Sequence, residues 1–564
     1  MKLRLLFLLL SASLFAQNQY PVDYFRSPLD IPLYLSGSFG ELRGNHFHTG
    51  LDFKTQQKEG WNVYAAADGF ISRIKISTYG YGKAIYITHP NGYTTVYGHL
   101  SRANGAIEAY IKQTHYKQQA YEIEMFPTPD QFPVKKGDVI AFSGNSGGSG
   151  GPHLHFEVRE TLSEKIVNPM LFGFDNKVAD TRLPVITSLI AYPLEDNSSV
   201  NQIQKPLLVN LSLQPDGSYI AEKILAKGKI GLGISAYDLT DRNYSKSGIF
   251  KVQAYTNGTP VFGYQFDIFG FDEGRYINAL LDYSRFKKSG MRIQKLFMTT
   301  PFPFSIIRTD PDNGIINVLP NLTQIYKIEI SDFHNNKVRI DVPIVYSPLP
   351  VLTPKEEIKK TSFFLKAKSD NNYKKDNISV FIPANTFYED FYLNFDVKDN
   401  VLYLQDDSVP VHSNLLITIE DTVSTAADKE KMFIASVDGK KLSYNATKRK
   451  DNTFTTYTKN LGQFTLAKDT IAPKITAVNI KEGTWMSTQK NIQLTISDNL
   501  SGLNTYNGYL NGKWILFEYD YKTKKITHYF DDGIFTDGRN DLKVVVSDNV
   551  GNSTIFETHF FRKK

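Results

Sequence analysis

Histidine residues are concentrated near the N-terminal end of this 564-residue chain. Seven of its 11 histidines lie between residues 46 and 155, and the other four are scattered. Imidazole is a common metal ligand, and its unperturbed pKa of about 6.5 lets it transfer protons near neutral pH. The concentration marks this region as the candidate site. The seven residues are His46, His48, His89, His99, His115, His153 and His155.

The run HLHFEV at residues 153–158 places two of these histidines two positions apart. Its alternation of polar and apolar residues is typical of a strand, on which His153, His155 and Glu157 share one face. The two imidazoles then stand about 7 Å apart, at about 3.3 Å per residue. One can bind a metal while the other reaches a water molecule beside it. A pair of surface histidines on a half-buried strand is the alternative interpretation.

The segment HTGLD pairs His48 with Asp52, four residues later. A tight turn that enters a strand can bring these residues together, and Gly50 allows a close approach of the backbone there. Neutral imidazole and carboxylate are ordinary ligands of Zn²⁺. With His155 they make three protein ligands, the number that a catalytic zinc site combines with one open position for water.

Three motifs, in this order, resemble those of the LytM/lysostaphin-like zinc peptidases. They are SGSFG at residues 36–40 followed by HTGLD, YGHL at residues 97–100, and GGSGGPHLHFE at residues 147–157. The resemblance covers residues 30–172 and does not extend to the rest of the chain. It implies an antiparallel β peptidase domain that uses Zn²⁺ as its cofactor.

The resemblance also implies a role for each residue of the site. His48, Asp52 and His155 are expected to hold the zinc ion. His99 and His153 are the expected catalytic residues, which flank the reacting water, and either of them can act as the general base. All five positions of the set are present in this chain.

The implied function is that of a zinc metalloendopeptidase, which hydrolyses peptide cross-links of bacterial peptidoglycan with a metal-activated water. A non-catalytic regulator of the cell wall or of an amidase is one alternative, because some relatives have lost their ligands. The complete ligand set argues against it. A secreted protease that acts on proteins is another alternative, which needs the same zinc site and differs only in its substrates.

Other features of the region receive different interpretations. His46 is interpreted as a rim or supporting residue, and His89 and His115 are predicted to be ordinary surface residues. The glycine-rich run at residues 144–152 lacks the Gly-Lys-Ser/Thr of a phosphate-binding loop. This run predicts a close approach of the backbone to the substrate or to the zinc-bearing strand.

The surrounding sequence predicts a β domain at residues 17–179 with a helical insertion. Two β-rich runs, at residues 83–89 and 93–99, flank an Asn-Gly dipeptide, which is a strong hairpin signal. Residues 106–125 have a helical pattern of apolar positions, so an insertion is expected at about residues 103–130.

An internal repeat occupies much of the remaining chain. DTRLPVIT at residues 180–187 resembles DTIAPKIT at residues 469–476. Two strands that end in Asp turns follow each of these openers. The pattern predicts immunoglobulin-like β-sandwich modules at residues 180–348 and 469–564. A β-rich domain of uncertain fold, residues 355–468, lies between them.

The turns of the repeat end at Asp238 and Asp332 in the first module and at Asp498 and Asp548 in the second. Such side chains supply oxygen ligands for Ca²⁺, but no segment has the spacing of an EF-hand. They are therefore interpreted as turn residues, with a Ca²⁺ site as the alternative. Because the chain has no Cys, each domain is expected to stand on its own core.

The composition favours a mainly β globular protein, because aromatic residues, which favour strands, make up 13% of the chain. The net charge of +6 is mild and suits a weakly anionic polymer such as peptidoglycan. No basic run or stacking platform indicates a nucleic-acid partner. Cell-wall or envelope proteins are candidate partners of the C-terminal β modules.

Residues 1–16 have the order of a secretory signal peptide, with Lys2 and Arg4 before an apolar run from Leu5 to Phe15. The run is too short to span a bilayer, and no later stretch of about 18 apolar residues follows it. A buried N-terminal helix is the alternative interpretation. The chain is therefore expected to be exported, periplasmic or secreted, without an integral membrane segment.

Overall fold

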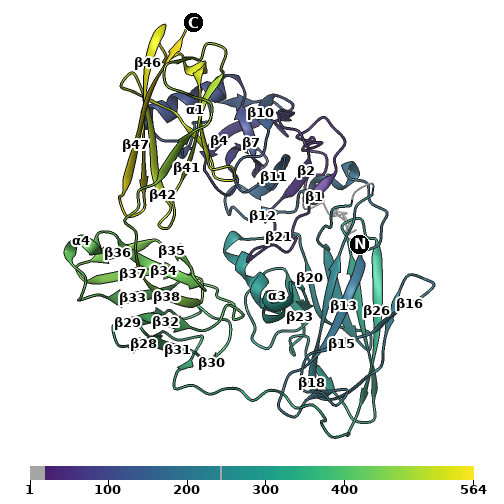
Figure 1. The fold of residues 1–564 in the computed structure, drawn as a ribbon. Helices are drawn as coiled ribbons and strands as arrows, with labels where there is room; N and C mark the ends of the chain where they lie inside the picture. The colour runs from purple at the N-terminus through teal and green to yellow at the C-terminus, as the bar shows by residue number, and fades with distance from the viewer. Residues whose placement is uncertain (1–19, 242–243, 564) are drawn as a thin grey trace, which may run out of the picture.

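The computed structural model describes residues 20–241 and 244–563, and the expected signal peptide lies outside them. The described chain consists mainly of β-strands with a few short helices, which confirms the predicted fold class (Figure 1). The strands of the N-terminal unit are β1 (Leu35–Gly37), β2 (Leu51–Lys54), β3 (Asn62–Tyr64), β4 (Gly69–Ile76), β5 (Lys83–Thr88), β6 (Tyr93–Gly98), β7 (Leu100–Ala103), β8 (Ile123–Met125), β9 (Pro133–Val134), β10 (Val139–Ser143), β11 (His153–Glu160) and β12 (Ile166–Val167).

The main sheet of the N-terminal unit has the strand order β1-β2-β11-β6-β5-β4-β8, with antiparallel neighbours. The apolar residues of β11 are fully buried. Because alternate residues of a strand face opposite sides, His153, His155 and Glu157 share the other face, as predicted. In the register, His155 lies opposite Asp52 on β2 and opposite Gly98 on β6. The sheet thus brings three distant sequence motifs together.

Two local predictions have different outcomes. The hairpin is confirmed, because β5 and β6 pair as antiparallel neighbours around residues 89–92. The helix α1 spans Gly105–Gln118 and ends where Gln119 adopts a left-handed conformation. The predicted extension of this helix to residue 125 is wrong. Residues 121–125 alternate between buried and exposed, the pattern of a strand, and they include β8, which pairs with β4.

The N-terminal unit and the module that follows it share one hydrophobic core. β12 pairs with β11 on one side and with β21 (Ile268–Phe269) of the module on the other. Phe47 stacks on Phe304 of the module, with ring centroids 5.1 Å apart. One network of buried residues extends from Phe25 to Ile344. The expectation of separate cores is therefore wrong for this pair, because aromatic side chains of both units fill the same interface.

The following sheets belong to three further units. A sheet of 13 strands lies within residues 185–346, and its longest path is β15-β13-β18-β26-β25-β19-β20-β23. These strands are β13 (Val185–Pro193), β15 (Leu207–Val209), β18 (Ile224–Tyr237), β19 (Lys251–Thr256), β20 (Thr259–Gln265), β23 (Ile307–Thr309), β25 (Thr323–Ser331) and β26 (Lys337–Tyr346).

The next unit has two five-stranded sheets, and buried residues of both form one separate core. The first sheet contains β28 (Asn371–Lys375), β29 (Ile378–Ile382), β33 (Leu415–Glu420), β36 (Thr447–Lys450) and β37 (Thr453–Thr458). The second sheet contains β31 (Phe395–Lys398), β32 (Val401–Leu404), β34 (Met432–Asp438), β35 (Lys441–Tyr444) and β38 (Gly462–Lys468).

The C-terminal unit has a four-stranded and a five-stranded sheet around a core of its own. The smaller sheet contains β39 (Lys474–Ala477), β41 (Asn491–Ser497), β44 (Glu518–Asp520) and β45 (Lys525–Tyr529). The larger sheet contains β40 (Thr484–Trp485), β42 (Leu503–Leu510), β43 (Lys513–Ile515), β46 (Gly538–Asp548) and β47 (Ser553–Arg562).

The C-terminal unit returns to the N-terminal unit, so that its yellow strands lie beside α1 in Figure 1. Lys83 Nζ lies 2.8 Å from a carboxylate oxygen of Glu518, and Lys112 Nζ lies 2.9 Å from one of Asp531. The hydroxyl of Tyr116 donates to Asp532. These contacts join parts of the chain that are about four hundred residues apart in sequence.

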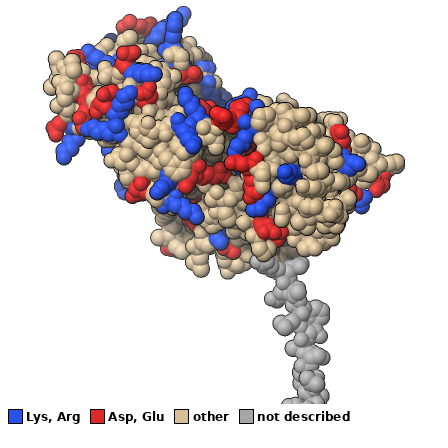
Figure 2. Space-filling model, turned by 90° about the horizontal axis from the view of Figure 1, so that it is seen from below, with Lys and Arg blue, Asp and Glu red and all other residues tan. Residues whose placement is uncertain are grey.

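The surface carries charges of both signs. Figure 2 shows Lys and Arg interspersed with Asp and Glu over the face that it draws, which agrees with the mild net charge of +6. A surface that carries both charges in mixture does not attract partners of one charge selectively. Among the described helices, none has the length and apolar character needed to cross a membrane.

Candidate metal centre

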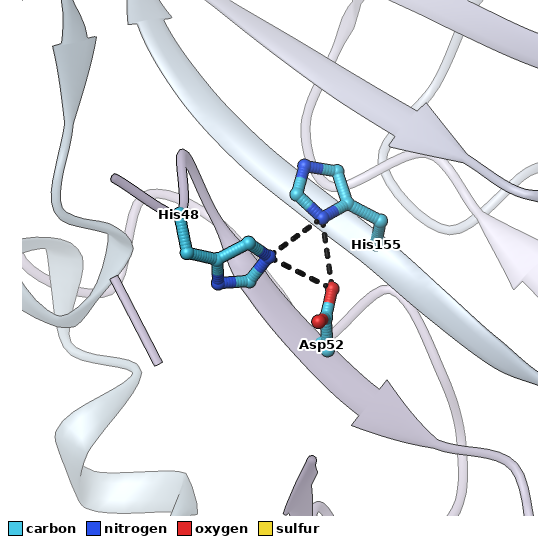
Figure 3. A group of neighbouring side chains, drawn as sticks. All are labelled: His48, Asp52 and His155. Atoms are coloured by element: carbon cyan, nitrogen blue, oxygen red, sulfur yellow. Dashed lines mark hydrogen bonds and ion pairs between the residues drawn. The ribbon is translucent and has the colours of Figure 1, made fainter. Parts of the chain in front are cut away.

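The three predicted metal ligands meet at one point, as Figure 3 shows. His48 Nε2 lies 3.1 Å from Asp52 Oδ1 and 3.2 Å from His155 Nδ1. Asp52 Oδ1 and His155 Nδ1 are 2.8 Å apart. All three side chains are buried. Gly50 makes this approach possible, since a Cβ there would lie 2.4 Å from the carbonyl oxygen of Phe156.

Outer contacts fix the proton on each imidazole. His48 Nδ1 lies 2.8 Å from the carbonyl oxygen of Ser38, which only accepts, so Nδ1 carries the proton and Nε2 a lone pair. His155 Nε2 donates to Glu157 Oε1 at 2.9 Å, which leaves the lone pair on Nδ1. Two lone pairs and the Asp52 carboxylate therefore face one point. Such a donor set repels itself and fits a divalent metal ion.

The electrostatics of the centre favour positive charge. Burial opposes the charge of Asp52, yet His48, His153 and His155 hold the pKa of its carboxyl well below its ordinary value. Burial also opposes a charge on His155, but the carboxylates of Asp52 and Glu157 beside its two nitrogens raise the pKa of this imidazole to about 9. The site thus keeps Asp52 ionised and stabilises a cation beside it.

Glu157 contacts the ligand His155 on the side away from the metal position. The sequence did not assign this role. Glu157 Oε1 accepts hydrogen bonds from Thr49 Oγ1 and the Tyr81 hydroxyl, each at 2.5 Å. Its Oε2 accepts from Arg159 Nε at 2.7 Å. Burial opposes ionisation of Glu157, but Arg159 and His155 hold its pKa far below the ordinary range. The carboxylate therefore fixes the orientation of His155. Its shared strand face with His155 was the one available signal.

His99 and His153 lie beside the three donors. Their ring centroids are 4.7 Å apart, and His153 Nε2 is 3.4 Å from Asp52 Oδ1. His99 Nδ1 donates to the carbonyl oxygen of Ser146, and His153 Nδ1 donates to that of Gly151, each at 2.8 Å. Each ring therefore carries its lone pair on Nε2. Burial and the neighbouring imidazoles lower the pKa of His99 to about 3, which keeps it neutral.

The backbone of His99 is strained. Its φ of 59° lies in the left-handed region, where a non-glycine residue costs roughly 1–3 kcal/mol. The amide of His99 donates to the carbonyl oxygen of Tyr81 at 2.9 Å, which helps to hold this conformation. The strain turns the imidazole toward His153 and His155, whose rings it contacts.

The glycine-rich run before His153 approaches the strand that bears His155, as predicted, and also makes a close backbone contact with the loop before β5. A Cβ on Gly147 would lie 2.3 Å from the amide nitrogen of Gly82 and 2.5 Å from the carbonyl oxygen of Gly80. The run therefore packs against the loop before β5, and Gly144 at its start forms an antiparallel bridge with His153 of β11. This packing positions Ser146, whose carbonyl oxygen holds His99.

The other histidines of the region lie outside the centre. His46 is exposed and contacts the carbonyl oxygen of Gly44 in its own loop. The prediction that His89 and His115 are surface residues is wrong, because they are 3% and 4% exposed. His89 contacts the carbonyl oxygen of Asp68 and the hydroxyl of Thr95, so its buried nitrogens are satisfied. His115 stacks on the ring of Tyr121.

Family models match two parts of the chain. Residues 46–119 match the model described as Peptidase family M23, and residues 362–469 match that of a Zu5-like domain. The first match contains His48, Asp52 and His99. His153 and His155 lie beyond it and reach the same centre through β11.

Individual relatives resemble the N-terminal unit. The DD-carboxypeptidase/endopeptidase Mpg of Neisseria meningitidis serogroup B is 37% identical over 123 residues, which cover 22% of this chain and 22% of that protein. The peptidoglycan DD-endopeptidase ShyC of Vibrio cholerae is 28% identical over 142 residues, 24% of this chain and 26% of that protein. The chain thus spans only a minor part of the length of these curated relatives.

A solved structure resembles the same unit. The catalytic domain of lysostaphin from Staphylococcus simulans is 27% identical, covers 24% of this chain and 87% of that chain, and has a TM-score of 0.18. The sequence matches and the three motifs point to one family. The N-terminal unit that carries His48, Asp52 and His155, called the M23 domain below, contains the match to Peptidase family M23 and is similar to the named endopeptidases over this region.

Proposed function

We propose that this chain is a zinc-dependent endopeptidase that hydrolyses peptide cross-links of bacterial peptidoglycan. The observation that carries the proposal is the meeting of His48 Nε2, Asp52 Oδ1 and His155 Nδ1 at one buried point. A relative named as a peptidoglycan DD-endopeptidase supports the choice of substrate. The intact set of five site residues favours an enzyme over a regulator that has lost its ligands.

Zn²⁺ suits a donor set of two imidazoles and one carboxylate. Held by His48, Asp52 and His155, it supplies a Lewis acid that polarises the scissile carbonyl and activates water. The buried Glu157 holds the proton of His155 at Nε2, so that Nδ1 stays available as a donor to the metal. Ser38 does the same for His48.

His153 is the proposed general base. Its Nδ1 keeps a proton against the carbonyl oxygen of Gly151, so Nε2 accepts the proton of the attacking water. The Asp52 carboxylate, 3.4 Å from Nε2, stabilises the positive charge that the ring gains. The same Nε2 then donates its proton to the nitrogen of the leaving amine.

His99 is the proposed positioning partner of His153. Its low pKa, about 3, disfavours protonation of the ring, so its Nε2 accepts a hydrogen bond without taking the proton. Its fixed backbone and the hydrogen bond to Ser146 hold the ring in place. A rigid acceptor of this kind orients the attacking water toward the carbonyl carbon.

We further propose that the chain acts outside the cytoplasm, in the periplasm or as a secreted protein. The signal-like order of residues 1–16 supports export. The expected substrate lies outside the cytoplasmic membrane, as does the wall on which the named DD-endopeptidase relative acts. Detection of the protein in a periplasmic or extracellular fraction, with residues 1–16 removed, tests the location.

The function is tested with zinc-loaded residues 17–564 and purified peptidoglycan sacculi. Mass spectrometry of the muropeptides should show loss of cross-linked dimers, and the new ends identify the bond that is cut. His155→Ala and His153→Ala should each abolish the loss. His46→Ala is the matched control, because this histidine is exposed and lies outside the centre, so it should cut like the wild type.

Three outcomes would contradict the proposal. Sacculi that stay intact with a zinc-bound wild type would favour the non-catalytic regulator. Cleavage of unfolded proteins together with intact sacculi would favour a secreted protease. Cleavage that survives His155→Ala would separate the activity from the metal centre.

A further inference from the structure

A second group of ionisable side chains lies between the M23 domain and the first module. Ligand atoms of Asp180, Asp332 and His334 lie within 4.8 Å of one another. Asp238 lines the same cavity, which has a volume of about 40 Å³. The three carboxylates are buried, at 8%, 3% and 3% exposed for Asp180, Asp238 and Asp332. Leu35 and Leu51, on the strands beside the metal centre, also line the cavity.

Two buried polar atoms of residues that line this cavity have no hydrogen-bond partner within the described chain. Among the described residues, neither Asp238 Oδ1 nor the hydroxyl of Ser247 has a hydrogen-bond partner. Ser247 is 4% exposed and sits opposite Asp238 in an antiparallel bridge. A buried polar atom without a partner costs free energy, so two of them at one cavity point to a missing ligand.

The charges of this cluster are not balanced within the described chain. Among its residues, no Lys or Arg forms an ion pair with Asp180, Asp238 or Asp332; the nearest cationic candidate is His334, whose Nδ1 is 3.9 Å from Asp180 Oδ2. Burial and the two neighbouring carboxylates raise the pKa of Asp238 to about 8. Three carboxylates at one buried place require either protonation or a bound cation.

A related cluster occurs in the C-terminal unit. Ligand atoms of Asp469, Asp498 and Asp548 lie within 4.8 Å of one another. Asp498 Oδ1 has no partner among the described residues. Ser501, which is fully buried, donates its amide to Asp469 Oδ2 at 2.9 Å, and its hydroxyl is unpartnered within the described chain. The two openers of the sequence repeat thus each lead into a carboxylate cluster.

Each cluster contains an Asn that makes the same two hydrogen bonds. In the first, Asn336 donates its amide to Asp332 Oδ1 at 2.9 Å and its side-chain nitrogen to the carbonyl oxygen of Asp180 at 3.2 Å. In the second, Asn552 makes the equivalent bonds to Asp548 and Asp469, at 2.8 and 3.0 Å. The hydrogen bonds that orient the carboxylates are therefore a property of the repeat.

The chemistry common to both clusters identifies the ligand. His334 corresponds to Val550 in the repeat, since each lies two residues after the turn Asp. An imidazole is therefore not part of the shared set, which consists of carboxylate oxygens. Hard cations prefer such oxygens, and Ca²⁺ binds them at about 2.3–2.6 Å, so that opposed ligands lie about 5 Å apart. Asp180 and Asp332 in the first cluster, and Asp469, Asp498 and Asp548 in the second, offer ligand atoms close enough together for this span.

We propose that Asp180, Asp238 and Asp332 bind one Ca²⁺ ion, and that Asp469, Asp498 and Asp548 bind a second. The first ion lies where the module is joined to the M23 domain. Ser38 lines this cavity and accepts a hydrogen bond from the amide of Gly248 at 2.8 Å, while its carbonyl oxygen holds His48. The ion thus stabilises the module next to Ser38, which orients the ligand His48.

Equilibrium dialysis with radioactive Ca²⁺ tests the proposal on residues 17–564, freed of metal and reloaded with one equivalent of Zn²⁺. The expected result is saturable binding of two Ca²⁺ ions per chain, retained in excess Mg²⁺. A lack of saturable binding up to about 10 mM, beyond the range of weak extracellular sites, overturns the proposal. Displacement of Ca²⁺ by stoichiometric Mn²⁺ or Zn²⁺ overturns the assignment to Ca²⁺.

Substitutions assign the ions to the two clusters. Asp238→Asn and Asp498→Asn should each reduce the stoichiometry from two to one. Asp216→Asn, which changes an exposed carboxylate of the first module, should leave it at two. Unchanged binding in both cluster variants overturns the proposal. The wild-type stoichiometry is a test that needs no variant to fold.

The sign of the thermal shift gives a further test. Without Ca²⁺, and at a pH above the raised pKa of Asp238, Asp238→Asn removes one of three repelling carboxylates, so the Tm should rise above that of the wild type. With saturating Ca²⁺ the order should reverse, because a ligand that binds only the folded state stabilises it. A wild-type Tm that is the same with and without Ca²⁺ contradicts the proposal.

Discussion

Lys522 of the C-terminal unit donates a hydrogen bond from Nζ to the carbonyl oxygen of Ser149, 3.2 Å away, although 373 positions separate them in sequence. The same nitrogen contacts the carbonyl oxygen of Asn145 at 2.5 Å. The hydroxyl of Ser149 lies 3.1 Å from His153 Nδ1. The last module thus holds the loop that leads to the proposed base.

Removal of this contact should lower activity without removing the metal. Lys522→Met keeps the length of the side chain but donates no hydrogen bond. The value of one such bond, about 0.5–1.5 kcal/mol, predicts a fall in kcat of about two- to twelvefold. Initial rates on a cross-linked muropeptide dimer measure the effect. Zinc content should stay at one per chain.

Lys513→Met is the control for this prediction, since Lys513 is an exposed lysine on the same unit. It should cut at the wild-type rate. A fall in KM or in zinc content with Lys522→Met, at an unchanged kcat, would show that the contact does not act through the loop of His153.

Glu157→Gln should weaken both the metal site and the fold. The change removes the charge that faces Arg159 and His155, and it leaves a buried guanidinium without its partner. Loss of one member of a buried pair costs about 3–5 kcal/mol in unfolding free energy. Loss of a ligand's outer partner lowers metal affinity by about 10- to 100-fold. Urea unfolding and competition with a zinc chelator measure the two effects.

Glu164→Gln is the matched control, because this carboxylate is largely exposed and lies 3.9 Å from Arg159. Its zinc affinity and stability should equal those of the wild type. The double variant Glu157→Gln/Arg159→Met should regain part of the lost stability, since it leaves no unpaired charge. A wild-type zinc affinity in Glu157→Gln would refute the orienting role.

The sequence predicted the residues of the metal centre because their relations are local. His48 and Asp52 lie four residues apart, and the alternation from His153 to Glu157 specifies one strand face. Spacing along one strand or turn determines which of these side chains share a face, independently of the rest of the fold. The motif order then supplied His99, for which spacing alone had no signal.

The support of the centre could not be predicted in this way. Thr49 and Tyr81 come from segments far from Glu157 in sequence, and they meet its carboxylate because of the register of the sheet. Arg159 lies two residues after Glu157 on the same strand, so alternation alone places it on that face. A register depends on long-range pairing that a single sequence pattern does not specify. The burial of His115 beneath the C-terminal unit is a similar case, since its cover lies four hundred residues away.

The buried His89 should make stability depend on pH. Burial lowers its pKa from 6.5 to about 4. Between these values the unfolded chain binds a proton that the folded chain does not, so stability is lost as the pH falls from 6.5 toward 4. The shift corresponds to about 3 kcal/mol. Urea unfolding between pH 4 and 7 should show a steeper loss for the wild type than for His89→Gln.

His559→Gln serves as the comparison, because this histidine is partly exposed and lies in the C-terminal unit. In His559→Gln, the free energy of unfolding of the N-terminal unit should vary with pH as it does in the wild type. Parallel curves for the wild type and His89→Gln would remove His89 as the source of the dependence.

The shared core should make the M23 domain and the first module unfold together. Phe47 is 1% exposed, and its ring contacts Phe266, Phe269 and Phe304 of the module. Phe47→Ala opens a cavity at this interface, and such changes cost about 3–5 kcal/mol. Calorimetry should show one transition for both units, moved to a lower temperature. Phe126→Ala, at an exposed position, should leave the transition unchanged.

The same relationship predicts that residues 20–179 do not fold alone. The isolated fragment would expose Phe47 and Phe39, which the module covers in the full chain, and it would lose the pairing of β12 with β21. An exposed aromatic patch of this kind favours aggregation over a cooperative fold. A soluble fragment with a sharp thermal transition and full zinc binding would show that the module is an addition to a complete domain, whereas a fragment that folds only when residues 180–348 are restored would show that the M23 domain needs the module to complete its core.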